Sequence, residues 1–206
     1  MRALLLDIGG VFYLNGPDDA YWSRWAKRCA CSSDILKHGL WHGPDVEAAN
    51  LGLIGREDYF HRAGERLRLS SLLVREMIEE LFAGGFNVDF ATCVRRVRDR
   101  GVSVSALTNS WHSEQELMAR RELAGLFDCV VSSRDVGMTK PDPRIYRQAM
   151  KRMNRRPDEL VFVDDTPECV AAARALGMHA IRFETSAQAS CELRALFKSK
   201  SSSAHP

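Results

Sequence analysis

Short apolar runs alternate with stretches whose apolar positions recur at helical spacing along most of this chain. Five of the apolar runs have the length of a strand and are bounded by turn residues. They predict strands at residues 3–6, 102–107, 129–131, 160–163 and 180–183. Segments with a 3.6-residue period lie between them, for example at residues 91–100. This alternation predicts an α/β, Rossmann-like fold, in which a parallel sheet carries helices on both faces.

Several of the expected helices begin at capping residues. Ser113 and Glu116 have the spacing of a capping box. Asp142-Pro143 and Thr166-Pro167 each place a capping side chain before a proline at the first helical position, and Gly177 would end the second of these helices. The apolar residues that follow Pro143 on one helical face are expected to be buried, namely Ile145, Ala149, Met150 and Met153.

Residues 14–88 depart from this alternation. They contain no convincing strand, and Gly84-Gly85 closes the stretch. Three segments in it have helical period, at residues 21–30, 44–69 and 71–82. We therefore expect a helical insertion after the first strand of an α/β core formed by residues 1–13 and 89–197. The polar, Ser-rich residues 198–206 are expected to be a disordered tail.

Composition narrows the class of protein further. The 206 residues carry a net charge of only +2, which gives no support to nucleic-acid binding, and no window is apolar enough to span a membrane. The four apolar residues before Asp7 are too few for the core of a signal peptide, so we expect a soluble, cytoplasmic protein.

The scattered cysteines are expected to be reduced thiols. Cys29 and Cys31, with His38 and His42 downstream, are spaced too tightly for a usual zinc site.

Polar side chains follow three of the predicted strands. Asp7 ends the first strand, Thr108-Asn109 ends the second, and Asp164-Asp165 ends the fourth. Adjacent strand ends in a parallel sheet lie about 5 Å apart, so these residues can share one pocket at the edge where ligands bind. Lys140 lies in the loop before a capped helix, where a cation can meet a phosphate.

The charges of these residues favour phosphoryl transfer. A carboxylate such as Asp7 can act as the nucleophile and form an aspartyl-phosphate. Clustered carboxylates repel one another unless a cation lies between them, and oxygen ligands without His or Cys indicate Mg²⁺. Lys140 would hold the nucleophile and the phosphoryl oxygens, and Thr108 would donate a hydrogen bond to the phosphoryl group.

Four motifs in this order resemble those of the haloacid dehalogenase superfamily. They are DIGGV at residues 7–11, LTNS at 107–110, KPDP at 140–143 and VDD at 163–165. The resemblance extends over residues 1–13 and 89–185, and the helical insertion at residues 14–88 is placed like the first type of cap in that family. It implies a haloacid dehalogenase-like core with a small helical cap.

The resemblance also implies a role for each matching position. Asp7 resembles the nucleophile and a magnesium ligand. Asp165 resembles the main metal ligand of the fourth motif, and Asp164 a second or water-mediated ligand. Thr108 and Lys140 resemble the phosphate-binding pair, to which Asn109 would add a hydrogen bond to substrate.

Gly9 departs from the family pattern. Most phosphatases of the family carry a second aspartate there, which protonates the leaving oxygen and then activates water. The backbone carbonyl of Gly9, which is the metal ligand at this position in the family, remains. General acid–base catalysis contributes about 10²–10⁴-fold to the rate. The loss of the acid should lower the rate least for substrates whose leaving group departs easily. We therefore expect a preference for anomeric sugar phosphates, acyl phosphates or aryl phosphates over simple alkyl phosphates.

These observations leave three hypotheses. The first is a Mg²⁺-dependent phosphatase of a small phosphorylated metabolite, with sugar phosphates among the candidates, acting through Asp7. The second is a catalytically weak or silent binding or regulatory protein, which Gly9 supports. The third is a haloacid dehalogenase-type carbon–halogen hydrolase, against which the pair Asp164-Asp165 argues because it would repel an anionic substrate. Aromatic residues of the insertion are expected in its core or facing the α/β domain. The oligomeric state stays open.

Overall fold

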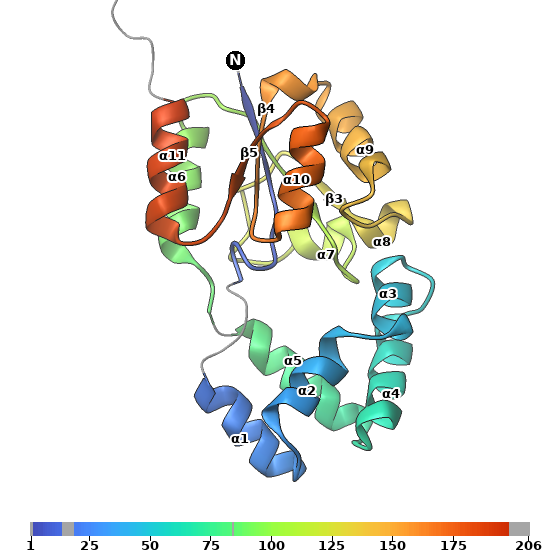
Figure 1. Cartoon of the computed structure of the whole chain (residues 1–206). Coiled ribbons are helices and arrows are strands. Elements are labelled where there is room, and N and C mark those ends of the chain that lie inside the picture. The colour runs from blue at the N-terminus through green and yellow to red at the C-terminus, as the bar shows by residue number, and fades with distance from the viewer. Residues whose placement is uncertain (1, 14–18, 84, 198–206) are drawn as a thin grey trace, which may run out of the picture.

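The computed structural model describes residues 2–13, 19–83 and 85–197 (Figure 1). Within these residues, the sheet has five parallel strands in the order β3-β2-β1-β4-β5. The strands are β1 (Ala3–Leu6), β2 (Val104–Thr108), β3 (Val130–Ser132), β4 (Leu160–Asp164) and β5 (His179–Arg182). The α/β fold with a parallel sheet is confirmed, and each predicted strand is present within two residues of its expected start.

Helices cover both faces of the sheet, and successive residues of β1 contact different sides. Leu4 and Leu6 pack in one apolar cluster with residues of α6 (Val88–Arg98) and α11 (Ser186–Leu196). Leu5 packs in another, with residues of α9 (Pro143–Met153) and α10 (Pro167–Ala175). Figure 1 shows α6 and α11 side by side, with α9 and α10 across the sheet from them. A strand buried on both faces is apolar at every position, as β1 is.

The capping signals explain where several helices begin. Ser113 and Glu116 form the expected capping box before α7 (Glu114–Met118), and the Asp142 side chain accepts from the Arg144 amide before α9. Thr166 does not cap α10 with its side chain, and its own amide donates to Asp164 Oδ1 at 2.8 Å. In α9, Tyr146 is buried with Ile145 and Ala149, whereas Met150 and Met153 are only partly buried. Two short elements complete the core, α8 (Ser133–Val136) and η1 (Pro157–Glu159).

The insertion is helical, as predicted, but it is more divided than the sequence pattern suggested. Its helices are α1 (Asp19–Cys29), α2 (Ser33–Trp41), α3 (Pro44–Asn50), α4 (Arg56–Leu67) and α5 (Ser71–Ala83). The single helix expected at residues 44–69 is wrong, because Gly52 adopts a φ of +72° and ends the first half. Helix α2 was missed, although Ser32 caps it by accepting from the Ile35 amide.

These helices form a separate layer with an apolar core of its own, and we call this layer the cap. In Figure 1 the cap lies beside the end of the sheet at which β1 leads into the first loop. The expected tail at residues 198–206 and the start of the insertion at 14–18 lie outside the described residues. None of the described helices combines the length and the apolar character that a membrane span requires.

Candidate active site

Strand register places the predicted acidic residues beside one another. Leu6 is in register with Val163 of β4, and the Asp7 amide continues this ladder by donating to the Val163 carbonyl at 2.9 Å. Asp7 therefore lies next to Asp164 at the carboxyl end of the sheet. On the other side of β1, Leu6 is in register with Ala106, so β2 delivers Thr108 to the same edge.

Three carboxylates gather at this edge. One carboxylate oxygen from each of Asp7, Asp164 and Asp165 lies within 4.8 Å of the other two. Asp7 and Asp164 are buried, and Asp165 is half-buried. The ammonium group of Lys140, also buried, lies 2.8 Å from Asp7 Oδ1 and 2.6 Å from Asp164 Oδ2. The structure thus brings together the acidic side chains and the lysine that the sequence singled out.

The electrostatics of this cluster show a shortage of positive charge. Burial raises the pKa of Asp7 to about 7, with a further rise from Asp164, and Lys140 offsets only part of this. Burial alone would lower the pKa of Lys140, but the carboxylates of Asp7 and Asp164 outweigh it and raise that pKa. The three carboxylates carry three negative charges when ionised, and the ammonium group of Lys140 balances one of them. Two further positive charges would neutralise the cluster.

This donor set fits a divalent cation such as Mg²⁺. All the side-chain donors are hard oxygens, which Mg²⁺ prefers, and the half-buried Asp165 leaves the cluster accessible from one side. Among the described residues, these three aspartates are the only group with this geometry, and Cys29, Cys31, His38 and His42 form no such group.

The loop that carries Lys140 is fixed by Asn109. The Asn109 side-chain amide donates to the Lys140 carbonyl at 2.9 Å, and its oxygen accepts from the Lys140 amide at 2.8 Å. Both ends of the Asn109 side chain are therefore engaged with the backbone of Lys140. This arrangement fits a role for Asn109 in positioning the lysine, and the predicted contact of Asn109 with substrate stays a prediction.

A pocket of about 440 Å³ lies over the cluster. Its lining includes Asp7, Gly9, Thr108, Asn109, Lys140 and Asp165. A Cβ atom built on Gly9 would meet no other heavy atom within 4 Å. Position 9 therefore borders open space in which a longer side chain could be accommodated.

A second cavity, of about 620 Å³, lies between the cap and the core and shares Gly9, Thr108 and Asn109 with the first. We call it the cap–core cavity. Aromatic rings from both domains line it, namely Tyr13, Trp22, Trp41, Phe82 and Trp111. The sequence interpretation did not assign Tyr13 or Trp111 to the site. Trp111 follows the LTNS motif directly, and that position was the available signal.

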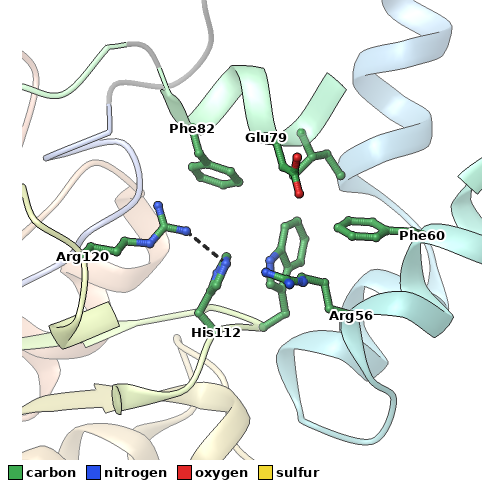
Figure 2. Close-up of a pocket in the computed structure, with 8 residues that line it drawn as sticks. Arg56, Phe60, Glu79, Phe82, His112 and Arg120 are labelled. Carbon is green, nitrogen blue, oxygen red and sulfur yellow. Dashed lines mark hydrogen bonds between the residues drawn. The ribbon is translucent and has the colours of Figure 1, made fainter. Parts of the chain in front are cut away.

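A smaller basic pocket of about 250 Å³ adjoins this cavity through Phe82, Trp111, His112 and Arg120. Figure 2 shows Arg56 of the cap and Arg120 of the core extending toward it from opposite sides. Arg120 Nη2 lies 3.0 Å from His112 Nε2, which fits a neutral imidazole that accepts a hydrogen bond. Burial and the nearby Arg120 lower the pKa of His112 to about 4.

Helix α3 of the cap contacts helix α8 of the core through a hydrogen bond. The Ser133 hydroxyl donates to the Asn50 carbonyl at 2.6 Å, and Ser133 Oγ accepts from the Ser110 amide at 2.9 Å. Ser110 is the last residue of the LTNS motif and lies just after the end of β2, so the cap contacts a loop that also borders the active site. The position of the cap and the geometry of the site are thereby linked.

Comparison with curated proteins gives relatives of very different length. The chain is 26% identical over 204 residues to the sesquiterpene phosphatase astK of Aspergillus oryzae, covering 95% of this chain and 96% of that protein. It is 33% identical over 129 residues to acyl-CoA dehydrogenase family member 10 of Mus musculus, covering 61% of this chain but only 11% of that protein.

Solved structures give the same fold. A haloacid dehalogenase family enzyme from Bacteroides thetaiotaomicron, in complex with magnesium and inorganic phosphate, superposes with a TM-score of 0.68. It is 19% identical and covers 89% of this chain and 94% of that one. The family profile of haloacid dehalogenase-like hydrolases matches residues 1–177, which include the cap and all four motifs. On this match and this architecture, the chain belongs to the haloacid dehalogenase-like hydrolases.

Proposed function

We propose that this protein is a Mg²⁺-dependent phosphomonoester hydrolase in which Asp7 is the nucleophile. The observation that carries the proposal is the contact of Lys140 with both Asp7 and Asp164, beside a third carboxylate. It supplies a nucleophile, a fixed cation for phosphoryl oxygens and a set of metal ligands in one place. The phosphatase named among the relatives and the magnesium–phosphate complex of a structural neighbour support the same reaction class.

The reaction would proceed in two displacements. Asp7 attacks the phosphorus atom, the ester P–O bond breaks, and an aspartyl-phosphate forms on Asp7. Water then attacks that phosphorus, the bond to Asp7 breaks, and inorganic phosphate leaves with Asp7 restored. Lys140 and Thr108 would bind the phosphoryl oxygens throughout, and Asn109 would keep Lys140 in place.

Four groups would hold the metal ion, namely the side chains of Asp7, Asp164 and Asp165 and the backbone carbonyl of Gly9. When bound, Mg²⁺ would supply positive charge for the carboxylates and the transferring phosphoryl group. Lys140 Nζ donates to one carboxylate oxygen of Asp164, and the Thr166 amide donates to the other. The position of Asp164 as a metal ligand would therefore depend on Lys140.

Gly9 makes this site unusual in its proton transfers. In the first displacement the departing alkoxide must take its proton from water, because position 9 has no acidic side chain. Substrates whose leaving oxygen is stable without a proton should therefore react fastest, which are acyl, aryl and anomeric sugar phosphates.

The proposal is tested by phosphate release from an aryl phosphate with and without Mg²⁺. We expect Mg²⁺-dependent turnover that Asp7→Asn abolishes, while Asp89→Asn, the same change at an exposed position of α6, leaves it unchanged. Absence of turnover in the wild-type protein would favour the silent binding protein. Chloride release from a haloacid without Mg²⁺ would favour a dehalogenase. Equal phosphate release by the Asp7→Asn variant would refute the assignment of the nucleophile.

A further inference from the structure

We propose that the substrate is a phosphate monoester of a bulky, largely apolar alcohol whose body occupies the cap–core cavity. This inference rests on the proposed function, because it takes the phosphate to bind at Asp7 and Lys140. The pocket over the carboxylate cluster, which we call the phosphate pocket, adjoins the cap–core cavity, since Gly9, Thr108 and Asn109 line both. The alcohol part of an ester bound at Asp7 would have this cavity as its neighbouring space.

The size of the cavity indicates a ligand larger than a short metabolite. Its volume of about 620 Å³ falls within the range of about 300–1,000 Å³ that pockets for drug-sized ligands occupy. The phosphate pocket is separate from this volume. A three-carbon phosphate would leave most of the cap–core cavity to water.

The lining indicates an apolar ligand. Besides the five aromatic rings, Ile8, Val46, Leu81 and Leu117 contribute aliphatic surface. Water in contact with such walls is displaced favourably by an apolar group, and the gain scales with the area covered.

Several polar side chains of the lining already have partners in the protein, although the indole N–H of Trp111 has none among the residues that the structure describes. Lys37 Nζ lies 3.8 Å from Asp19 Oδ1, and Arg120 contacts His112. The Asn109 amide is engaged with Lys140, and the Ser110 hydroxyl accepts from the His112 amide at 3.0 Å. The partnered side chains offer few free hydrogen-bonding groups to the many hydroxyl groups of a sugar, which favours a largely apolar ligand body.

The aromatic wall of the cavity is preformed. Trp111 of the core stacks between two rings of the cap, with its centroid 5.8 Å from that of Trp41 and 4.8 Å from that of Tyr59. The interplanar angles of 8° and 25° show nearly parallel rings. A wall fixed in this way needs little ordering when a ligand binds, which favours affinity for an apolar body that fits it.

Turnover of matched esters tests this inference. n-Octyl phosphate and glucose 6-phosphate are both esters of primary alcohols, so the absence of an acid at Gly9 affects them similarly, but their bodies differ in polarity. We expect kcat/KM to rise at least about tenfold from n-butyl to n-octyl phosphate, mainly through KM, and n-octyl phosphate to exceed glucose 6-phosphate. Equal values along the alkyl series, or a preference for the sugar phosphate, would overturn the inference.

A pair of variants on α5 links the preference to the cavity. Leu81→Glu would place a charge in the lining, whereas Leu72→Glu makes the same change at an exposed position of the same helix. We expect Leu81→Glu to abolish the preference for n-octyl over n-butyl phosphate while turnover of acetyl phosphate persists, and Leu72→Glu to retain the preference. Retention of the preference in Leu81→Glu would contradict the assignment of the cavity.

Tryptophan fluorescence separates this inference from the proposed reaction. Three of the four tryptophans, Trp22, Trp41 and Trp111, line the cavity. Titration of the Mg²⁺-loaded protein with n-octylphosphonate, which cannot be hydrolysed, should change the emission saturably, and methylphosphonate should not. Binding without phosphatase activity would refute the reaction but keep the ligand class. Acetyl phosphate turnover without octylphosphonate binding would keep the reaction and refute the ligand class.

Discussion

Replacing Gly9 with aspartate should restore the proton donor that the site lacks. The backbone at Gly9 has no positive φ, and a Cβ built there has no heavy atom within 4 Å, so the new side chain has room. Steric cost is therefore expected to be small. The added carboxylate joins three others that face one ammonium group, so the variant should also depend more strongly on Mg²⁺.

The size of the gain follows from the role of the acid. Acid–base catalysis contributes about 10²–10⁴-fold, which corresponds to about 3–5 kcal/mol of activation free energy. The gain should appear with alkyl phosphates, whose alkoxide needs a proton to leave. With p-nitrophenyl phosphate, whose phenolate leaves unprotonated, the first displacement should gain little. The ratio of alkyl to aryl turnover is thus the informative quantity.

Steady-state phosphate release from n-butyl and p-nitrophenyl phosphate measures this ratio for the wild-type protein and for Gly9→Asp and Gly9→Asn. We expect Gly9→Asp to raise the alkyl-to-aryl ratio of kcat/KM at least tenfold, as a lower bound on the acid effect. Gly9→Asn has nearly the same shape without the acid and should leave the ratio near that of the wild type. An unchanged ratio in Gly9→Asp, or an equal rise in Gly9→Asn, would refute the reasoning.

Three further predictions concern stability. Lys140→Met should lower the free energy of unfolding by about 3–5 kcal/mol in a urea titration without Mg²⁺, because it leaves buried carboxylates unpaired, and added Mg²⁺ should recover part of the loss. Gly52→Ala should destabilise more than Gly55→Ala in thermal melts, since Gly52 has a φ of +72° and its Cβ would lie 2.5 Å from the Arg134 carbonyl oxygen. Burial lowers the pKa of His112 to about 4, so the contribution of His112 to stability should be full above pH 6.5 and fall by up to about 3 kcal/mol toward pH 4, while the raised pKa of Asp7 acts in the opposite direction over this range. His112→Gln should flatten that pH dependence.

Local patterns predicted the core of this protein well because most of its strands are buried on both faces. Such strands are short, mainly apolar runs, and β1, β2 and β4 each end at or beside a polar residue that the sequence shows directly. The parallel register then carries Asp7 and Asp164 to adjacent positions. Residues 157 positions apart can be placed together in this way, because the topology of the sheet fixes their relation.

The cap–core cavity could not be predicted in the same way. The stacking of Trp111 between Trp41 and Tyr59 depends on how the cap seats on the core, and no periodicity encodes that contact. The engagement of Asn109 with Lys140 likewise depends on the path of a loop. The break at Gly52 was missed because the helical spacing of apolar residues continues across it, while its positive φ is visible only in the structure.

Chemical trapping of the intermediate tests the central claim most directly. Single turnovers of an aryl phosphate in the presence of Mg²⁺ would be quenched in acid and reduced with borohydride, which converts an acyl phosphate to an alcohol. Peptide mass spectrometry should then find homoserine in place of aspartate at position 7, and only when both Mg²⁺ and substrate are present. Full turnover with residue 7 unmodified, or modification at a different residue, would contradict the account.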